Sequence, residues 1–216
     1  MKIFADTANL KDLKELISWG IVDGCTTNPS IVAKEKGVDF KTRMKEIIDL
    51  VDGPVSIEVT TNDLHEMITE SKKYAAWGDN VNVKIPMGIT GLKAVNILNK
   101  NDIKTNVTAC MSTKQAVLAA KAGATFVSLF WARMEDMGYN SELIVGETAE
   151  IFERHNIKSE IILGSFRQVS HINRAMLSGA HILTIPTPIL KKLPWNPRTK
   201  STIDEFLKSW EEFNKN

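Results

Sequence analysis

The chain has 216 residues, of which 43% are hydrophobic and 25% charged, a balance typical of a folded globular domain. Its 27 basic and 26 acidic residues give a formal net charge of +1, which gives no reason to expect nucleic acid or an anionic membrane as a partner. The two cysteines, Cys25 and Cys110, form neither a metal-binding spacing nor a disulfide framework. No apolar leader or bilayer-length run is present, so a cytoplasmic location is expected.

Short apolar runs alternate with longer amphipathic segments. The expected strands, in chain order, are residues 2–6, 24–28, 55–59, 81–85, 104–108, 125–130, 160–165 and 181–185. Helices are expected from caps at Asn9, Asn62 and Ser112 or Thr113 to residues 19, 77 and 123, and over residues 91–99, 141–155 and 168–177. About eight strands that alternate with about eight helices predict an α/β fold, a single small (β/α)8 barrel domain over residues 1–216. A doubly wound open sheet is the alternative.

The end of the chain has a different pattern. Residues 194–197 read Pro-Trp-Asn-Pro and predict a turn, and residues 202–213 predict a helix. Phe206, Leu207, Trp210 and Phe213 lie on one face of that helix. Because this face is too aromatic to be left in water, it is expected to pack on the barrel or on another subunit.

The fourth expected strand carries a lysine in an apolar setting. Residues 81–86 read Val-Asn-Val-Lys-Ile-Pro, so Lys84 has apolar neighbours on both sides. A lysine is almost never fully buried unless it is paired, and burial disfavours the charged form of its amine. Because a neutral amine attacks carbonyl carbons, Lys84 indicates an enzyme that forms a Schiff base. The alternative is a strand-end lysine whose ammonium group reaches water.

Polar residues recur near the carboxyl ends of the expected strands, where barrel enzymes carry their reacting groups. The two-residue period of a strand lets five of them point into the barrel: Asp6, Asn28, Glu58, Lys84 and Thr108. Thr26, Asn106, Ser128, Ser165 and Thr184 lie near the same ends. The set suits aldol chemistry, in which Lys84 attacks a ketose carbonyl while Asp6 and Glu58 move protons. Asn28 and Asn106 could hold substrate hydroxyls. The alternative is a polar plug that closes the barrel mouth.

An anion site is predicted near the late strands. Arg133 follows the sixth expected strand, and Ser165 and Arg167 follow the seventh, just before a helix. Hydroxyl and guanidinium groups at a helix start bind phosphate well, and late barrel strands commonly do so. The alternative is a pair of surface arginines. No G-x-G-x-x-G or P-loop pattern occurs and the four histidines have no ligand spacing, so neither a nucleotide cofactor nor a metal is expected.

Several motifs together resemble a known family. They are residues 4–9 (Phe-Ala-Asp-Thr-Ala-Asn), 19–24 (Trp-Gly-Ile-Val-Asp-Gly), 26–30 (Thr-Thr-Asn-Pro-Ser), 83–86 (Val-Lys-Ile-Pro), 105–108 (Thr-Asn-Val-Thr) and 119–124 (Ala-Ala-Lys-Ala-Gly-Ala). In combination they resemble the small transaldolases, a family that also includes the fructose-6-phosphate aldolases. The resemblance covers nearly the whole chain.

The resemblance implies a role for each matching residue. Lys84 would form the Schiff base, Asp6 and Glu58 would be the acid/base pair, and Thr108 would help to place the catalytic water. The substrate-binding set would be Thr26, Asn28, Asn106, Phe130, Arg133, Ser165 and Arg167, with the last three at the phosphate. The aldolase branch typically has glutamine in place of Glu58 and tyrosine in place of Phe130, so this chain resembles the transferase branch.

The reaction that this implies is transfer of a dihydroxyacetone unit from sedoheptulose 7-phosphate to glyceraldehyde 3-phosphate, without a cofactor, in the pentose phosphate pathway. A fructose-6-phosphate aldolase, or a barrel that binds sugar phosphates without turnover, are the alternatives. The resemblance also implies pentameric rings, often paired into decamers. Leu129, Trp131 and Ala132 depart from the family pattern Ser-Pro-Phe-Val-Gly-Arg, and Cys110 and Met111 are unusual after strand five. These departures bear on acceptor preference.

Overall fold

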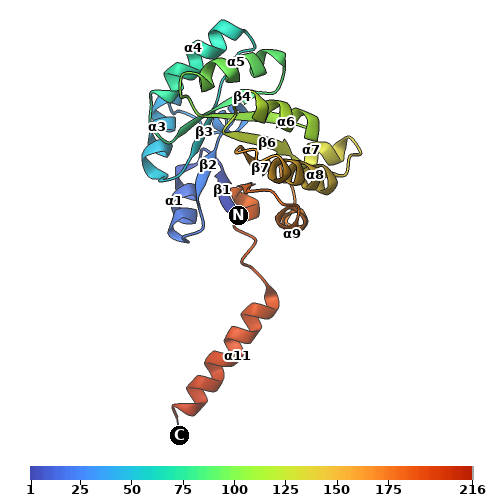
Figure 1. Ribbon diagram of the computed structural model, residues 1–216. Coiled ribbons are helices and arrows are strands. Elements are labelled where there is room, and N and C mark those ends of the chain that lie inside the picture. Colours follow the sequence, from blue (N-terminus) through green and yellow to red (C-terminus); the bar gives the residue numbers. More distant parts are fainter. Residues whose placement is uncertain (216) are drawn as a thin grey trace.

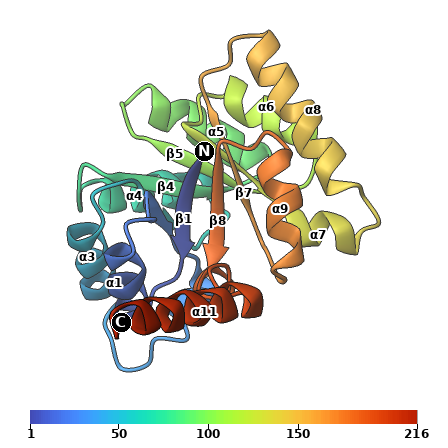
Figure 2. The same cartoon turned by 90° about the horizontal axis from the view of Figure 1, so that it is seen from below.

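A computed structural model describes residues 1–215 and shows a closed barrel of eight parallel strands in the order β1 to β8 (Figure 1). The strands are β1 (Lys2–Asp6), β2 (Gly24–Thr26), β3 (Val55–Glu58), β4 (Val81–Pro86), β5 (Thr105–Cys110), β6 (Phe126–Phe130), β7 (Glu160–Gly164) and β8 (Ile182–Pro186). The barrel closes because β1 pairs with both β2 and β8, and β8 lies beside β1 in Figure 2. The predicted (β/α)8 barrel is confirmed, and the open sheet is wrong.

Helices follow the strands along the chain, and all but the last of them surround the barrel (Figure 1). They are α1 (Leu10–Ser18), α2 (Pro29–Val32), α3 (Phe40–Leu50), α4 (Leu64–Ala75), α5 (Ile89–Asn99), α6 (Thr113–Lys121), α7 (Trp131–Asp136), α8 (Ser141–Arg154), α9 (Ser170–Leu177), α10 (Thr187–Leu190) and α11 (Pro197–Phe213). The sequence did not predict α2, α3, α7 or α10. No helix within residues 1–215 combines the length and apolarity needed to cross a bilayer.

Four helix starts differ from the prediction, those of α4, α5 and α9 and that of α11. Asp63, not Asn62, caps α4, because the Asp63 side chain accepts a hydrogen bond from the Glu66 amide. Helix α5 begins at Ile89 and contains Gly91, where a Cβ atom would lie 2.0 Å from the Pro86 carbonyl oxygen. The glycine therefore marks a close approach of α5 to the end of β4 and not a helix start. Helix α9 begins at Ser170, two residues later than expected.

The second strand ends earlier than expected, because its last expected residue caps a helix. It spans Gly24–Thr26, whereas residues 24–28 were expected. The chain turns after Thr27 because Asn28 caps α2 and accepts a hydrogen bond from the Ile31 amide at 3.0 Å. Asn28 thus leaves the sheet and stands at the mouth of the barrel.

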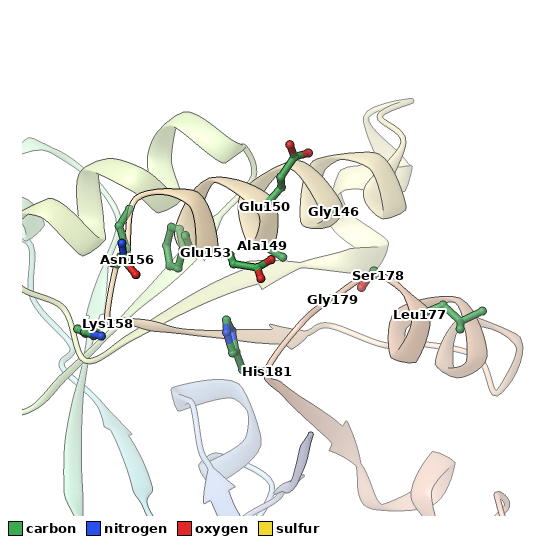
Figure 3. Close-up of a pocket in the computed structure, with 12 residues that line it drawn as sticks. Gly146, Ala149, Glu150, Glu153, Asn156, Lys158, Leu177, Ser178, Gly179 and His181 are labelled. Carbon is green, nitrogen blue, oxygen red and sulfur yellow. The ribbon is translucent and has the colours of Figure 1, made fainter.

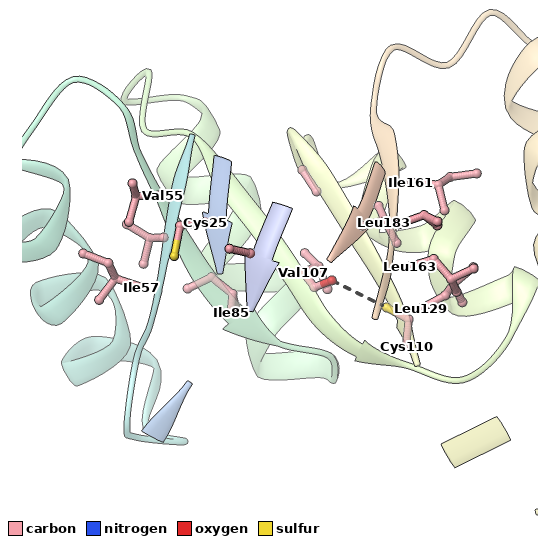
Figure 4. Packing of buried hydrophobic residues seen from close by; sticks show 14 of the residues in the cluster. Cys25, Val55, Ile57, Ile85, Val107, Cys110, Leu129, Ile161, Leu163 and Leu183 are labelled. Carbon is pink, nitrogen blue, oxygen red and sulfur yellow. Dashed lines mark hydrogen bonds between the residues drawn. The ribbon is translucent and has the colours of Figure 1, made fainter. Parts of the chain in front are cut away.

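Strand side chains alternate between the helix-facing surface and the barrel interior. The helix-facing positions form one large buried cluster, part of which is drawn in Figure 4: Cys25, Val55, Ile57, Ile85, Val107, Cys110, Leu129, Ile161, Leu163 and Leu183. Inside the barrel, Phe4, Phe126, Ile162 and Ile182 form a separate apolar cluster, in which Phe4 and Phe126 pack edge to face. Two residues further along β1, β6 and β8 come Asp6, Ser128 and Thr184. An apolar layer therefore lies below a polar one.

Helix α11 extends away from the barrel (Figure 1). It starts at Pro197, earlier than the expected residue 202, because Asn196 caps it and Pro197 fits its first turn. Phe206, Trp210 and Phe213 are each more than 60% exposed, so the barrel of the same chain does not cover the apolar face. The expected packing on the chain's own barrel is therefore not observed, and packing on another subunit stays a prediction.

Candidate active site

A cavity of about 820 Å³ opens at the carboxyl ends of the barrel strands. Nine of the eleven residues predicted from the sequence line it: Asp6, Thr26, Asn28, Glu58, Lys84, Thr108, Phe130, Arg133 and Ser165. Asn106 and Arg167 are not part of the lining. The residues come from strands β1 to β7 and the loops that follow them, so only the closed barrel brings them together.

Lys84 lies at the floor of this cavity. It is 5% exposed, and its strand neighbours Val83 and Ile85 are fully buried. Strand register sets Glu58 of β3 beside Lys84 of β4, and the Lys84 Nζ lies 3.0 Å from a Glu58 carboxylate oxygen. The Nζ also donates to the Thr27 carbonyl at 3.2 Å. The amine is thus nearly desolvated, fixed in direction, and next to a carboxylate that can exchange a proton with it.

Asp6 is the second carboxylate of the cavity. Its Oδ1 accepts a hydrogen bond from the Thr26 hydroxyl at 2.8 Å. Burial raises the pKa of the Asp6 carboxyl above its usual range, and the nearby Lys84 charge and the Thr26 hydrogen bond oppose that rise. A carboxyl whose pKa moves towards neutrality is better matched to proton transfer at physiological pH.

Thr108 and Asn106 differ in what they offer to a ligand. Thr108 lines the cavity, and its buried hydroxyl has no hydrogen-bond partner among the described residues, which leaves this group available to a water or a substrate hydroxyl. Asn106 is fully buried, and its amide is already used: Ser128 donates to its Oδ1 and its Nδ2 donates to Ser56. The structure therefore turns Asn106 towards Ser128, which lines the cavity, and does not bring Asn106 itself to the surface of the cavity.

The predicted anion site is divided. Arg133 and Ser165 line the cavity, and the Arg133 guanidinium lies over the Phe130 ring, 5.8 Å from its centroid. Arg167 instead forms two hydrogen bonds with Asp136 of α7, at 2.8 and 2.6 Å. This contact lowers the pKa of the Asp136 carboxyl and holds the arginine away from the cavity lining. Arg167 also precedes the start of α9 by three residues, so it is not at a helix N-terminus.

The cavity includes residues that were not among the predicted site residues. Lys34 follows α2, a helix that the sequence did not predict, and Met111 follows β5. Ser128 and Thr184 were recognised as polar residues near strand ends, yet they were not assigned to the site. Strand periodicity could have placed both in the barrel interior, because Ser128 lies two residues after Phe126 and Thr184 two residues after Ile182.

A second cavity, of about 550 Å³, lies at the opposite ends of the strands, between α8, α9 and the start of β8 (Figure 3). Two of its polar side chains have partners: Glu150 pairs with Arg154, and His181 accepts from the Ile161 amide through Nδ1. It holds no buried amine near a carboxylate. In the part of the chain that the structure describes, no group of three or more His, Cys, Asp or Glu residues is arranged to hold a metal ion.

Comparisons with known proteins agree with this geometry. A family model described as "Transaldolase/Fructose-6-phosphate aldolase" matches residues 3–216. A "Probable transaldolase" of Streptococcus pyogenes serotype M5 (strain Manfredo) is 45% identical over 215 residues and covers 100% of both chains. A "Probable transaldolase" of Alkaliphilus metalliredigens (strain QYMF) is 46% identical over 211 residues and covers 98% of each chain.

Proposed function

The chain belongs to the transaldolase/fructose-6-phosphate aldolase family, and we propose that it is a transaldolase that forms a Schiff base at Lys84. The proposed reaction moves a dihydroxyacetone unit from sedoheptulose 7-phosphate to glyceraldehyde 3-phosphate, giving erythrose 4-phosphate and fructose 6-phosphate. One observation carries the proposal: Lys84 is buried at the floor of a cavity, with Glu58 3.0 Å from its Nζ and Asp6 lining the same cavity.

The first half of the reaction forms the covalent intermediate. Lys84 first passes a proton to Glu58. Its neutral amine then attacks the ketose C2 carbonyl, and the carbonyl oxygen takes up a proton to give a carbinolamine. Loss of water from this adduct gives the iminium ion. Glu58 can supply and accept these protons through a water held by the Thr108 hydroxyl, which has no protein partner within residues 1–215.

The second half cleaves the carbon–carbon bond. Asp6 removes the proton of the C4 hydroxyl, the C3–C4 bond breaks, and its electron pair passes to the iminium nitrogen. The aldehyde product leaves, and an enamine of dihydroxyacetone stays on Lys84. Attack of this enamine on an acceptor aldehyde reverses the steps and completes the transfer.

Phe130 favours transfer over release of free dihydroxyacetone. Release requires protonation of the enamine carbon, and a phenolic hydroxyl at position 130 would order a water for this step. A phenylalanine ring carries neither donor nor acceptor. Glu58 is ionisable where a glutamine would not be, which suits it to carry protons through the catalytic water. The aldolase reading remains the second candidate, since the family includes both activities.

The experiment that tests the proposal compares the two fates of the enamine. Purified protein is given fructose 6-phosphate with and without erythrose 4-phosphate as the acceptor aldehyde, and sedoheptulose 7-phosphate and free dihydroxyacetone are both measured. We expect transfer to exceed release by a wide margin, and Phe130→Tyr to increase release. Phe130→Leu is the matched control, because it changes the ring without adding a hydroxyl, and it should not increase release. Wild-type release as fast as transfer would make the protein an aldolase.

Arg133 is expected to contribute more to phosphate binding than Arg167. Arg133→Ala removes a charge-assisted contact from the cavity lining and should raise KM for phosphorylated sugars by about 10- to 100-fold. Arg167→Ala should have a smaller effect, because Arg167 must first leave Asp136 to reach a phosphate. Steady-state kinetics of both variants provide the measurement. Arg154→Ala, on the outer helix α8, is the control, and a larger effect of Arg167→Ala would contradict the assignment.

We also propose that a neighbouring copy of the chain covers α11. Its apolar face is exposed in the single chain, with Trp210 and Phe213 stacked 5.6 Å apart between ring centroids. Deletion of residues 202–216 should reduce the molar mass measured by light scattering at micromolar concentration. A full-length protein that is monomeric under the same conditions would rule out this assembly.

A further inference from the structure

Thr184, in the middle of β8, is linked to Asp6, the catalytic carboxylate of the proposed reaction, through the Thr26 hydroxyl. Its Oγ1 lies 2.5 Å from the Oγ1 of Thr26, and the Thr26 hydroxyl lies 2.8 Å from Asp6 Oδ1. Thr184 is 7% exposed and lines the cavity. The three side chains come from three adjacent strands, since β1 pairs with both β2 and β8.

The donors and acceptors in the hydrogen bonds that link Thr184, Thr26 and Asp6 follow from counting their protons. A threonine hydroxyl has one proton to donate, whereas an ionised carboxylate only accepts. The Thr26 proton is used on Asp6, so the short contact between the two hydroxyls requires Thr184 as the donor. The order is therefore Thr184 to Thr26 to Asp6, and each bond polarises the next.

A glycine holds Thr184 in the rotamer that this order needs. A Cβ atom on Gly164 of β7 would lie 2.8 Å from Thr184 Cγ2, so the missing side chain leaves the space that the threonine methyl occupies. With the methyl seated there, the branched Cβ leaves the hydroxyl directed to Thr26. Valine at position 184 could keep this packing but could not donate.

We propose that Thr184 is a positioning residue for Asp6: its hydroxyl fixes the Thr26 hydroxyl as a donor to the carboxylate and so favours the form of Asp6 that accepts the substrate proton. This inference rests on the proposed function, which gives Asp6 that role. The titratable and charged groups that face Asp6 are Lys84 on β4, Glu58 on β3, Lys34 after α2 and the Cys25 thiol on β2. Substitution of Thr184 leaves all four unchanged.

Two substitutions separate the hydroxyl from the methyl. Thr184→Val keeps the methyl and removes the hydroxyl, whereas Thr184→Ser keeps the hydroxyl and removes the methyl. Thr105→Val is the matched control, because Thr105 is a buried barrel threonine whose hydroxyl has no partner among residues 1–215. Thr184→Ala repeats the test without a branched side chain if the valine variant does not fold.

The primary readout is titration of the Asp6 carboxyl by NMR on protein labelled with ¹³C-aspartate, with the resonance assigned from Asp6→Asn. Thr184→Val removes the hydrogen bond from Thr184 to Thr26. Its loss should raise the midpoint of the Asp6 titration by about 0.5–1 pH unit. The acidic limb of the transfer rate should move in the same direction, with kcat changed more than KM. Thr184→Ser keeps the donor but loses the methyl that fixes its rotamer, so it should move the midpoint by less than Thr184→Val does, and Thr105→Val should leave the midpoint unchanged.

An unchanged Asp6 midpoint in Thr184→Val or Thr184→Ala would overturn the inference, as would equal shifts in the serine and valine variants. Because the titration does not depend on turnover, failure of the proposed function has a different signature. In that case the wild type neither transfers sugar nor forms a covalent adduct, while the Asp6 midpoint still responds to loss of the Thr184 hydroxyl.

Discussion

Lys84→Ala is expected to abolish both covalent trapping and sugar transfer. Borohydride reduction with fructose 6-phosphate should add the mass of the reduced ketose adduct to the wild-type chain, and peptide mapping should locate the adduct at Lys84. Lys34 also lines the cavity and faces Asp6, but its side chain is exposed, whereas Lys84 is buried with its Nζ 3.0 Å from Glu58. Alanine removes the nucleophile, so no residual amine can replace it.

Lys104→Ala is the control for this experiment. Lys104 precedes β5, and its amine donates to the Asp79 carbonyl on the exposed side of the barrel, so trapping and transfer should persist in this variant. Circular dichroism should show that Lys84→Ala is folded. An adduct on a different lysine of the wild-type protein would contradict the assignment of the nucleophile.

The predictable part of the site follows from strand periodicity. Asp6 lies two residues after Phe4, and both point into the barrel, so an apolar floor and a polar mouth can be inferred from one strand. The same rule places Glu58, Lys84 and Thr108, because parallel strands in one closed sheet carry their carboxyl ends to the same side. These residues need only the correct fold class to be brought together.

Strand periodicity could not predict how deep within the barrel an inward-facing side chain lies. Asn106 points inward like Thr108, but the register of β5 against β6 sets Asn106 beside Phe126, in the apolar layer. Its amide therefore lies below the cavity and bonds to Ser128 and Ser56. The stagger between neighbouring strands fixes this depth, and a strand pattern contains no information about that stagger.

The position of Arg167 differs from the prediction because its partner lies far away in the sequence. Arg167 was expected at a phosphate site, but Asp136 holds it from 31 residues away. Asp136 belongs to α7, a six-residue helix that directly follows β6 and has no side-chain cap to mark its start. A helix that begins without a cap, directly after a strand, leaves no start signal in the sequence.

Asp6→Asn is expected to lower kcat by about 10²–10⁴-fold, the contribution typical of a positioned acid or base. Asparagine keeps the shape of the side chain and can still accept the Thr26 hydrogen bond through its oxygen, but it cannot take the C4 hydroxyl proton. Trapping at Lys84 should remain detectable, since Glu58 still lies beside the amine. Steady-state transfer kinetics and borohydride trapping on the same samples separate the two steps.

The same substitution should not lower the melting temperature at neutral pH. Burial raises the pKa of the Asp6 carboxyl, so between the unfolded value near ~3.9 and the higher native value the native state binds more protons than the unfolded chain. The free energy of unfolding therefore falls as pH rises through this window, and the ionised Asp6 costs stability above it. Asparagine removes that cost. A melting temperature clearly below that of the wild type at pH 7 would contradict this account.

Asp12→Asn is the control, because it is expected to change the melting temperature in the opposite direction. Hydrogen bonds from Lys191 and Thr187 lower the pKa of the Asp12 carboxyl, so its contribution to stability is present above the unfolded pKa and is lost as pH falls. The substitution should therefore lower the melting temperature at pH 7, where Asp6→Asn does not. The two carboxylates line one cavity, yet the first is destabilised by its surroundings and the second is stabilised. This difference supports the proposed role of Asp6 in proton transfer, whereas Asp12 joins α1 to α10.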